Sequence, residues 1–270
     1  MALRHRRYPA VAMKSALLLI LCSSSALFSS CSSSGNKEPK KAAPPAATPA
    51  YFKVDPATAG SLSGTVRFTG KAPAKKIIDM SGDPACVEAH HGKAYGESLV
   101  VNGKGDLANV FVYVKSGLEG KTFETPTTPV MFDQRGCWFS PRVFGIQAGQ
   151  PLQISNSDPV THNVHPIAQV NREWNHSQGP GDAPLARKFH RLEVMIPVKC
   201  NIHSWMHAFI GVLDHPYFAV SGPDGAFAIP NLPPGDYVVE AWHEKLGVQQ
   251  VRVSVAPSAK QEIGFTFKGE

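Results

Sequence analysis

Apolar and polar residues alternate over short stretches along most of the chain, which predicts β-strands rather than helices. Two such stretches cover residues 152–156 and 193–200. From Pro216 the alternation is regular on both sides of Asp224-Gly225, and another turn follows at 233–235, which predicts a hairpin and a further strand. Four more strands are expected at 63–69, 107–115, 249–255 and 262–267. The pattern predicts an all-β fold.

Composition supports this reading. The 270 residues include 23 glycines and 23 prolines, which is typical of short strands joined by many turns. A hydrophobic content of 43% is enough to form buried cores, so the composition excludes wholesale disorder. The length suits one large domain or two small ones.

The N-terminal segment has the features of an export signal. Its only charges up to residue 31 are those of Arg4, Arg6, Arg7 and Lys14, and the apolar run at 15–21 is too short to cross a bilayer. Residues 1–31 are therefore expected to be a secretory signal peptide.

The end of this signal resembles a bacterial lipobox at Phe28-Ser29-Ser30-Cys31, although an aliphatic residue is usual where Phe28 stands. The resemblance implies lipid modification of Cys31; simple cleavage nearby is the alternative. Residues 32–56 are rich in Ser, Lys, Pro and Ala and are expected to form a disordered tether. The mature protein would then be anchored by lipid on the periplasmic side of a bacterial membrane, and Ser32 favours the outer membrane. Without acylation the same segment would be a tail on a soluble periplasmic protein.

Charge at first suggests a nucleic-acid partner, because the formal net charge is +6. Removing residues 1–31 takes away four positive charges and no negative ones, which leaves 6 − 4 = +2. Nucleic-acid binding is therefore not expected.

Three cysteines follow the signal, in a compartment that is oxidising. Cys86 and Cys137 lie in turn-like settings, and pairing them as a disulfide would stabilise the fold by ~4 kcal/mol in the chain-entropy estimate. The alternative is a second metal site that combines Cys86 with His90 and His91. Cys200 is left single.

The surroundings of Cys200 predict a metal site. Cys200, His203 and Met206 form the pattern C-x2-H-x2-M, which offers a thiolate, an imidazole and a thioether. One thiolate, two imidazoles and a weak axial methionine are the ligands of a blue-copper centre, so a second histidine is required. His162 follows a predicted strand and a turn, and is the candidate.

In these features the chain resembles the cupredoxins, most closely plastocyanin and amicyanin. His162-Asn163-Val164 matches the family's H-N-V segment, and the spacing after Cys200 matches its short ligand loop. Phe139-Ser140-Pro141, with Ile146 and Gly149, resembles the strand pair that precedes the first histidine. The resemblance covers residues 119–215 and implies a Greek-key sandwich that binds one type 1 copper.

The resemblance also assigns roles to neighbouring residues. It implies that Asn163 joins the two ligand loops and hydrogen-bonds near the cysteine sulfur. In the family, one ligand histidine reaches the surface within an apolar patch through which electrons pass. Trp205 lies beside the ligands and is the candidate for such an electron port; ordinary packing is the alternative.

The C-terminal part resembles a second family, the carboxypeptidase regulatory-like domains, which are small transthyretin-like β-sandwiches. Asp224 to Phe227 and Leu232 to Tyr237 match its D-G-x-F and L-P-P-G-x-Y turns. Because the first strands of such a domain are found only upstream, residues 57–118 plus 216–270 are expected to form a sandwich that the cupredoxin domain splits. One alternative is a cupredoxin domain packed edge to edge with the sandwich. Another is an enlarged cupredoxin with an N-terminal extension and a separate C-terminal module.

Together these features predict a lipid-tethered copper protein that carries single electrons between redox partners such as a cytochrome c or a periplasmic dehydrogenase. A copper storage or delivery protein is one alternative, and a structural or interaction β-sandwich stabilised by copper is another. The sequence contains neither the H-x-H and H-C-H clusters of multicopper oxidases nor a second cysteine in the ligand loop. The chain is therefore expected not to be an enzyme.

Overall fold

The computed structural model of the chain describes residues 50–90 and 92–269, whose regular secondary structure is β-strand apart from one short helix. The prediction of an all-β fold is confirmed. The predicted signal peptide of residues 1–31 and the lipidation candidate Cys31 lie outside the described residues. Among the residues described, no helix is long and apolar enough to cross a membrane.

One sandwich carries the predicted copper ligands. It has a five-stranded sheet in the order β10-β9-β12-β13-β7 and a four-stranded sheet in the order β11-β8-β5-β6. The apolar faces of the two sheets enclose a core that includes Phe132, Ile154 and Ile210. The strands of this sandwich are β5 (Val130–Arg135), β6 (Trp138–Ser140), β7 (Val143–Gln147), β8 (Leu152–Asn156), β9 (His162–Pro166), β10 (His176–Gln178), β11 (Leu185–Arg187), β12 (Glu193–Lys199) and β13 (His207–Leu213).

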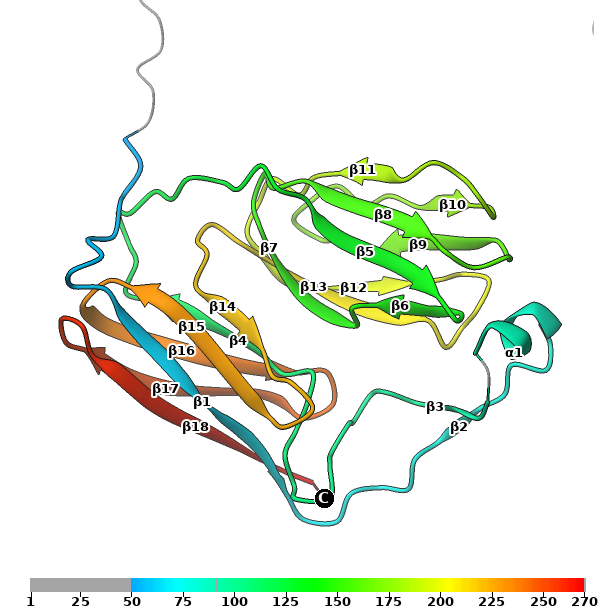
Figure 1. Cartoon of the computed structure of the whole chain (residues 1–270), viewed down its shortest axis with the longest axis horizontal. Coiled ribbons are helices and arrows are strands. Elements are labelled where there is room, and N and C mark those ends of the chain that lie inside the picture. Colours follow the sequence, from blue (N-terminus) through cyan, green and yellow to red (C-terminus); the bar gives the residue numbers. More distant parts are fainter. Residues whose placement is uncertain (1–49, 91, 270) are drawn as a thin grey trace, which may run out of the picture. The chain divides into compact units, whose positions relative to one another are not determined.

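A second pair of sheets combines strands from both ends of the described chain. One sheet has the order β15-β1-β18 and the other β14-β4-β16-β17, and they share a core that includes Leu62, Val239 and Phe267. Figure 1 shows β1 and β18, which are parallel, running side by side. The strands are β1 (Gly60–Thr69), β4 (Phe111–Ser116), β14 (Phe218–Val220), β15 (Ala226–Leu232), β16 (Gly235–His243), β17 (Gly247–Val255) and β18 (Lys260–Lys268).

The hairpin predicted around Asp224-Gly225 is wrong. The strands on either side of this turn, β14 and β15, pair with β4 and β1 respectively and therefore belong to different sheets. Phe227 of β15 lies in the core of the second pair of sheets, and Ala219 of β14 packs against the same core. Alternating apolar residues identify the buried face of a strand but not its sheet, so the pattern did not distinguish a turn between sheets from a hairpin. The observed hairpin joins β16 and β17.

An excursion between β1 and β4 contains β2 (Ile77–Ile78), helix α1 (Pro84–His90) and β3 (Ala94–Tyr95). Met80, Cys86 and Ala94 from this excursion pack into the core of the first sandwich. From the sequence, this excursion was expected to belong to the second sandwich, as part of residues 57–118. The buried side chains of the excursion instead cover the end of the first sandwich. The domain boundaries drawn from the sequence remain predictions.

A third apolar cluster joins strands of both sandwiches, with Phe111 and Tyr113 of β4 packed against Val143, Met195 and Leu213. Gly211 of β13 allows this close approach, since a Cβ atom there would lie 2.4 Å from the ring of Phe111. Arg142 also forms a buried ion pair with Glu244 at 2.7 Å, which links the β6–β7 connection to the β16–β17 hairpin.

The start of the described chain is attached to the folded body. The backbone N–H of Phe52 donates to the carbonyl of Thr122 at 2.7 Å, and the ring of Phe52 meets that of Phe123 edge-on. Phe52 therefore contacts the folded body, although the tether was expected to extend to residue 56.

Candidate metal centre

Three predicted ligands from two separate segments meet at one end of the first sandwich. His162, Cys200 and His203 are all buried, and their donor atoms lie within 4.8 Å of one another. The two Nδ1 atoms of the histidines are 2.9 Å apart, and Sγ of Cys200 is 3.9 Å from Nδ1 of His203. The fold therefore directs one sulfur and two imidazole nitrogens at a common point.

Local structure explains this convergence. His162 is the first residue of β9, and Cys200 directly follows β12, which pairs with β9. Two backbone hydrogen bonds close the loop after Cys200. The N–H of Met206 donates to the carbonyl of His203 at 3.0 Å, and the N–H of Cys200 donates to the carbonyl of Met206 at 3.2 Å. Met206 ends this loop fully buried in the core of the sandwich.

Asn163 connects the two ligand segments. Its Oδ1 accepts from the N–H of Asn201 at 2.7 Å and lies 3.4 Å from Sγ of Cys200. Its Nδ2 donates to Oδ1 of Asn175 at 2.6 Å, which fixes the orientation of the amide. These contacts match the role that the resemblance to cupredoxins implies.

The surroundings of Cys200 favour a thiolate. Burial alone would raise its pKa, but the hydrogen bond with His162 and the N–H of His203 outweigh burial and lower the pKa to about 6. Burial likewise disfavours the charged form of His162, but Asp158 and Cys200 raise its pKa. A thiolate is the form of cysteine that binds metals, so the donor is ready at neutral pH.

Two carboxylates that the sequence analysis did not assign to the site complete it. Oδ2 of Asp158 lies 2.9 Å from Nε2 of His162, and Oδ2 of Asp83 lies 2.9 Å from Nε2 of His203. Asp158 stands four positions before His162, in the turn that precedes it. Asp83 comes from an excursion 120 positions away, and its sequence context suggests only a turn or a helix cap.

Cys86 and Cys137 form a disulfide beside these carboxylates. Sγ of Cys86 is 3.5 Å from Nε2 of His203. The alternative use of Cys86 with His90 as metal ligands does not match this arrangement, because the Cys86 sulfur is bonded to Cys137 and Nδ1 of His90 accepts from the indole N–H of Trp138 at 2.9 Å. His91 lies outside the described residues.

The donor set fits copper. A soft thiolate with two imidazoles is the equatorial set of a blue-copper site, and the buried thioether of Met206 closes the same loop. Burial also excludes water from the donors, since His162 is 0% exposed and His203 3%.

The burial of His203 differs from the family pattern, in which a ligand histidine reaches the surface. Helix α1 is the cause: Asp83, which precedes it, and Cys86 within it both lie against Nε2 of His203. The ring of Trp205 packs against that of His203, with the centroids 5.1 Å apart. Trp205 is half-buried, and its indole N–H donates to the carbonyl of Cys137.

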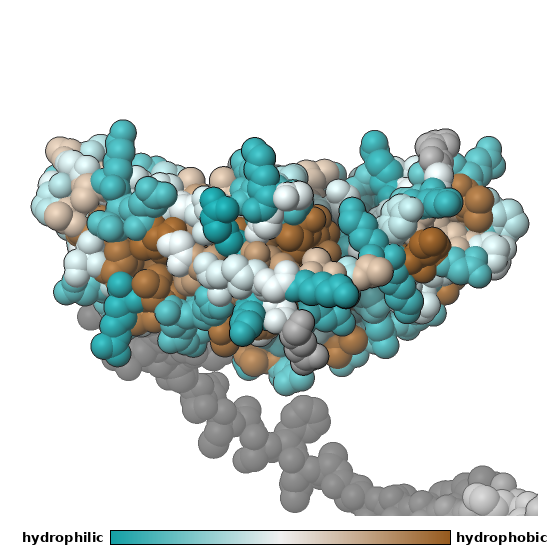
Figure 2. Space-filling view, turned by 90° about the horizontal axis from the view of Figure 1, so that it is seen from below, coloured by the Kyte–Doolittle hydropathy of each residue, from teal (hydrophilic) through white to brown (hydrophobic). Residues whose placement is uncertain are grey.

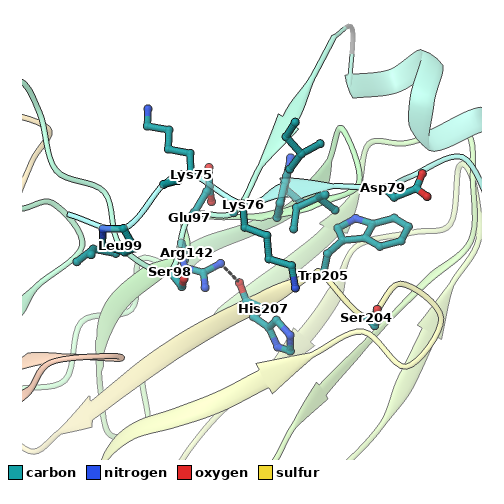
Figure 3. A pocket seen from close by; sticks show the side chains of 16 residues that line it. Lys75, Lys76, Asp79, Glu97, Ser98, Leu99, Arg142, Ser204, Trp205 and His207 are labelled. Atoms are coloured by element: carbon teal, nitrogen blue, oxygen red, sulfur yellow. Dashed lines mark hydrogen bonds between the residues drawn. The ribbon is translucent and has the colours of Figure 1, made fainter. Parts of the chain in front are cut away.

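A cavity of about 640 Å³ opens beside Trp205. Figure 3 shows Trp205 in its wall together with Lys76, Arg142 and His207, and Arg142 donates to the carbonyl of His207. On the face that Figure 2 shows, apolar patches are separated by hydrophilic side chains. Through this cavity Trp205 has access to solvent close to His203.

Among solved structures, the chains similar to this one include a copper-containing enzyme and cupredoxins. A copper-containing nitrite reductase from Thermus scotoductus SA-01 is 23% identical; the match covers 36% of this chain and 25% of that one, with a TM-score of 0.31. A purple cupredoxin from Nitrosopumilus maritimus is 19% identical over 31% of this chain and 98% of its own, with a TM-score of 0.27. An oxidised variant of amicyanin is 15% identical over 37% of this chain and 97% of its own, with a TM-score of 0.29. No protein-family model matches the sequence, and no curated protein is significantly similar to it.

These comparisons correct one prediction. The chain was expected not to be an enzyme, but a copper enzyme is among the similar chains, so the exclusion of enzymes is wrong. This chain spans only a quarter of that enzyme's length. The resemblance to carboxypeptidase regulatory-like domains is not shown by the comparisons and stays a prediction.

Proposed function

We propose that this chain is a type 1 copper protein that carries single electrons, with His162, Cys200, His203 and Met206 as the ligands of one copper ion. The observation that carries the proposal is the convergence of two Nδ1 atoms and one low-pKa thiol in a buried site. Bound there, copper would alternate between Cu(I) and Cu(II) and so accept or give up one electron.

The surrounding chain supports this chemistry by holding the ligands still. The two histidines are fixed at their Nε2 atoms by carboxylates, and Cys200 is held between β12 and the closed loop that ends at Met206. Copper(I) and copper(II) prefer different geometries, so ligands that barely move favour fast exchange of electrons. A redox titration tests the proposal: the copper-loaded protein should take up and release one electron per chain reversibly.

Storage or delivery of copper is the alternative that uses the same ligands. The described site disfavours it, because both histidines and the cysteine are buried and a departing ion would have to pass the excursion that holds α1. Rapid loss of copper to a chelator, faster than reversible reduction, would favour delivery and contradict the carrier.

We place the exit of electrons at Trp205, because its ring touches His203 and lines the cavity beside the site. Trp205→Leu should slow electron exchange with a soluble one-electron reagent without changing the absorption spectrum, since Trp205 is not a ligand. Stopped-flow oxidation of the reduced protein measures the rate. Trp138→Leu is the matched control, because Trp138 lines the same cavity but its indole donates to His90. Equal rates in the two variants would contradict the port.

The proposed location is the periplasmic side of a bacterial membrane, with a lipid on Cys31 and a redox protein such as a cytochrome c or a periplasmic dehydrogenase as partner. Cys31→Ala should move the protein from the membrane fraction into the soluble periplasmic extract and leave its spectrum unchanged. Wild-type protein found in that extract, with the mass of an unmodified N-terminus, would contradict the anchor.

A further inference from the structure

Each histidine ligand has a carboxylate on the ring nitrogen that faces away from the other ligands. Oδ2 of Asp158 is 2.9 Å from Nε2 of His162, with both side chains almost fully buried. Oδ2 of Asp83 is 2.9 Å from Nε2 of His203, and the side chain of Asp83 is 25% exposed. At each of the two histidines, a carboxylate oxygen therefore lies 2.9 Å from Nε2. The two carboxylates come from two unrelated segments of the chain.

This environment decides which nitrogen faces the site. A carboxylate accepts hydrogen bonds, so each Nε2 carries the proton and donates it. In a neutral ring the Nδ1 atom is then left with a lone pair. The two Nδ1 atoms point at each other across 2.9 Å, next to Sγ of Cys200. Two facing lone pairs would repel each other at this distance, so a proton or a metal cation is needed between the two Nδ1 atoms.

The carboxylates are themselves held in place. Oδ1 of Asp83 accepts from the N–H of Ala85 at 3.1 Å at the start of α1, so this residue caps the helix with one oxygen and holds His203 with the other. Oδ1 of Asp158 accepts from the N–H of Gly136, and its Oδ2 from the N–H of Cys137 at 2.8 Å. Neither carboxylate can turn away from its histidine without breaking backbone contacts.

The disulfide connects the two arrangements. Cys86 lies in α1, three residues after Asp83, and it is bonded to Cys137, whose N–H binds Asp158. The excursion with α1 is thereby attached to the β5–β6 turn at the one place where both carboxylates contact their histidines.

We propose that Asp83 and Asp158 are positioning residues of the metal centre, each holding the Nε2–H of one histidine ligand, and that the Cys86–Cys137 disulfide fixes both carboxylates. This inference rests on the proposed copper function. Through Asp83, the excursion then has a role beyond covering the site. The carboxylates of Asp83 and Asp158 also place two negative charges next to the ligands, and these charges stabilise copper(II) relative to copper(I).

The first test uses the metal-free protein and is therefore independent of copper. In nitrogen-15 spectra of the imidazole groups, Nε2 of His162 and of His203 should each carry a slowly exchanging proton. If Nε2 of either ring is unprotonated, the proposal is overturned. Failure of the copper function would instead appear as the absence of a thiolate-to-copper band, with the nitrogen-15 result unchanged.

The second test measures the copper protein itself. Asp83→Asn and Asp158→Asn should each raise the reduction potential and lower the affinity for copper(II) about ten- to hundredfold. Asp83→Asn is the decisive variant if Asp158→Asn does not fold, because asparagine also caps helices. Glu173→Gln is the matched control: Glu173 lies 2.6 Å from Nε2 of His165, which is not a ligand. A potential in Asp83→Asn equal to that of Glu173→Gln would overturn the positioning role.

Discussion

Cys200→Ser should abolish the visible absorption of the copper-loaded protein completely. The band arises from charge transfer between a thiolate and copper(II), and a serine hydroxyl does not ionise at neutral pH. Among the described residues, Cys200 is the one cysteine outside a disulfide, so no other thiolate is at hand to replace it. The measurement is the spectrum of the mature variant after loading with copper(II) and removal of excess metal.

Met206→Leu serves as the control for this loss. Met206 is fully buried in the same loop and leucine has a similar volume, so the fold should be retained. The band should remain, and the reduction potential should rise because the axial donor is gone. A band that survives in Cys200→Ser would show that another cysteine binds the copper.

Removal of the disulfide should have the largest effect on stability. Cys86 and Cys137 are 51 positions apart, and the chain-entropy estimate for a loop of that length is ~4 kcal/mol. The double variant Cys86→Ala/Cys137→Ala should lose about that much free energy of unfolding. Denaturant unfolding of the metal-free protein measures it, because bound copper would add its own stabilisation.

A reductant provides the control for this prediction. It should destabilise the wild-type protein to the level of the double variant and leave the variant itself unchanged. In the unfolded, unreduced, copper-free mature protein, one thiol per chain should react, that of Cys200. Three reactive thiols, or equal stability of the two proteins without reductant, would contradict the disulfide.

The candidate ligands could be predicted from the sequence because their spacing is local. Cys200, His203 and Met206 lie within one loop, and His162 follows a strand whose alternation of apolar residues is plain. Alternation also located half of the strands that the structure describes, since one buried face repeats every second residue. It did not show which sheet a strand joins, and for that reason the turn at Asp224-Gly225 was misread as a hairpin.

The carboxylates and the cover over His203 could not be predicted in this way. Asp83 reaches His203 only because the excursion folds back over the end of the first sandwich, a contact between residues 120 positions apart. Nothing in the residues around Asp83 distinguishes a ligand-positioning carboxylate from an ordinary helix cap. The resemblance to cupredoxins, in turn, implied that a ligand histidine reaches the surface, whereas here Asp83 and Cys86 of the excursion cover His203.

The visible spectrum of the wild-type mature protein, loaded with one equivalent of copper(II), is the decisive measurement for the proposed type 1 copper site. We expect an intense band in the orange-red and a narrow copper hyperfine splitting in electron paramagnetic resonance, both lost on reduction by one electron and regained on oxidation. A colourless copper(II) complex with a wide hyperfine splitting would contradict the type 1 site.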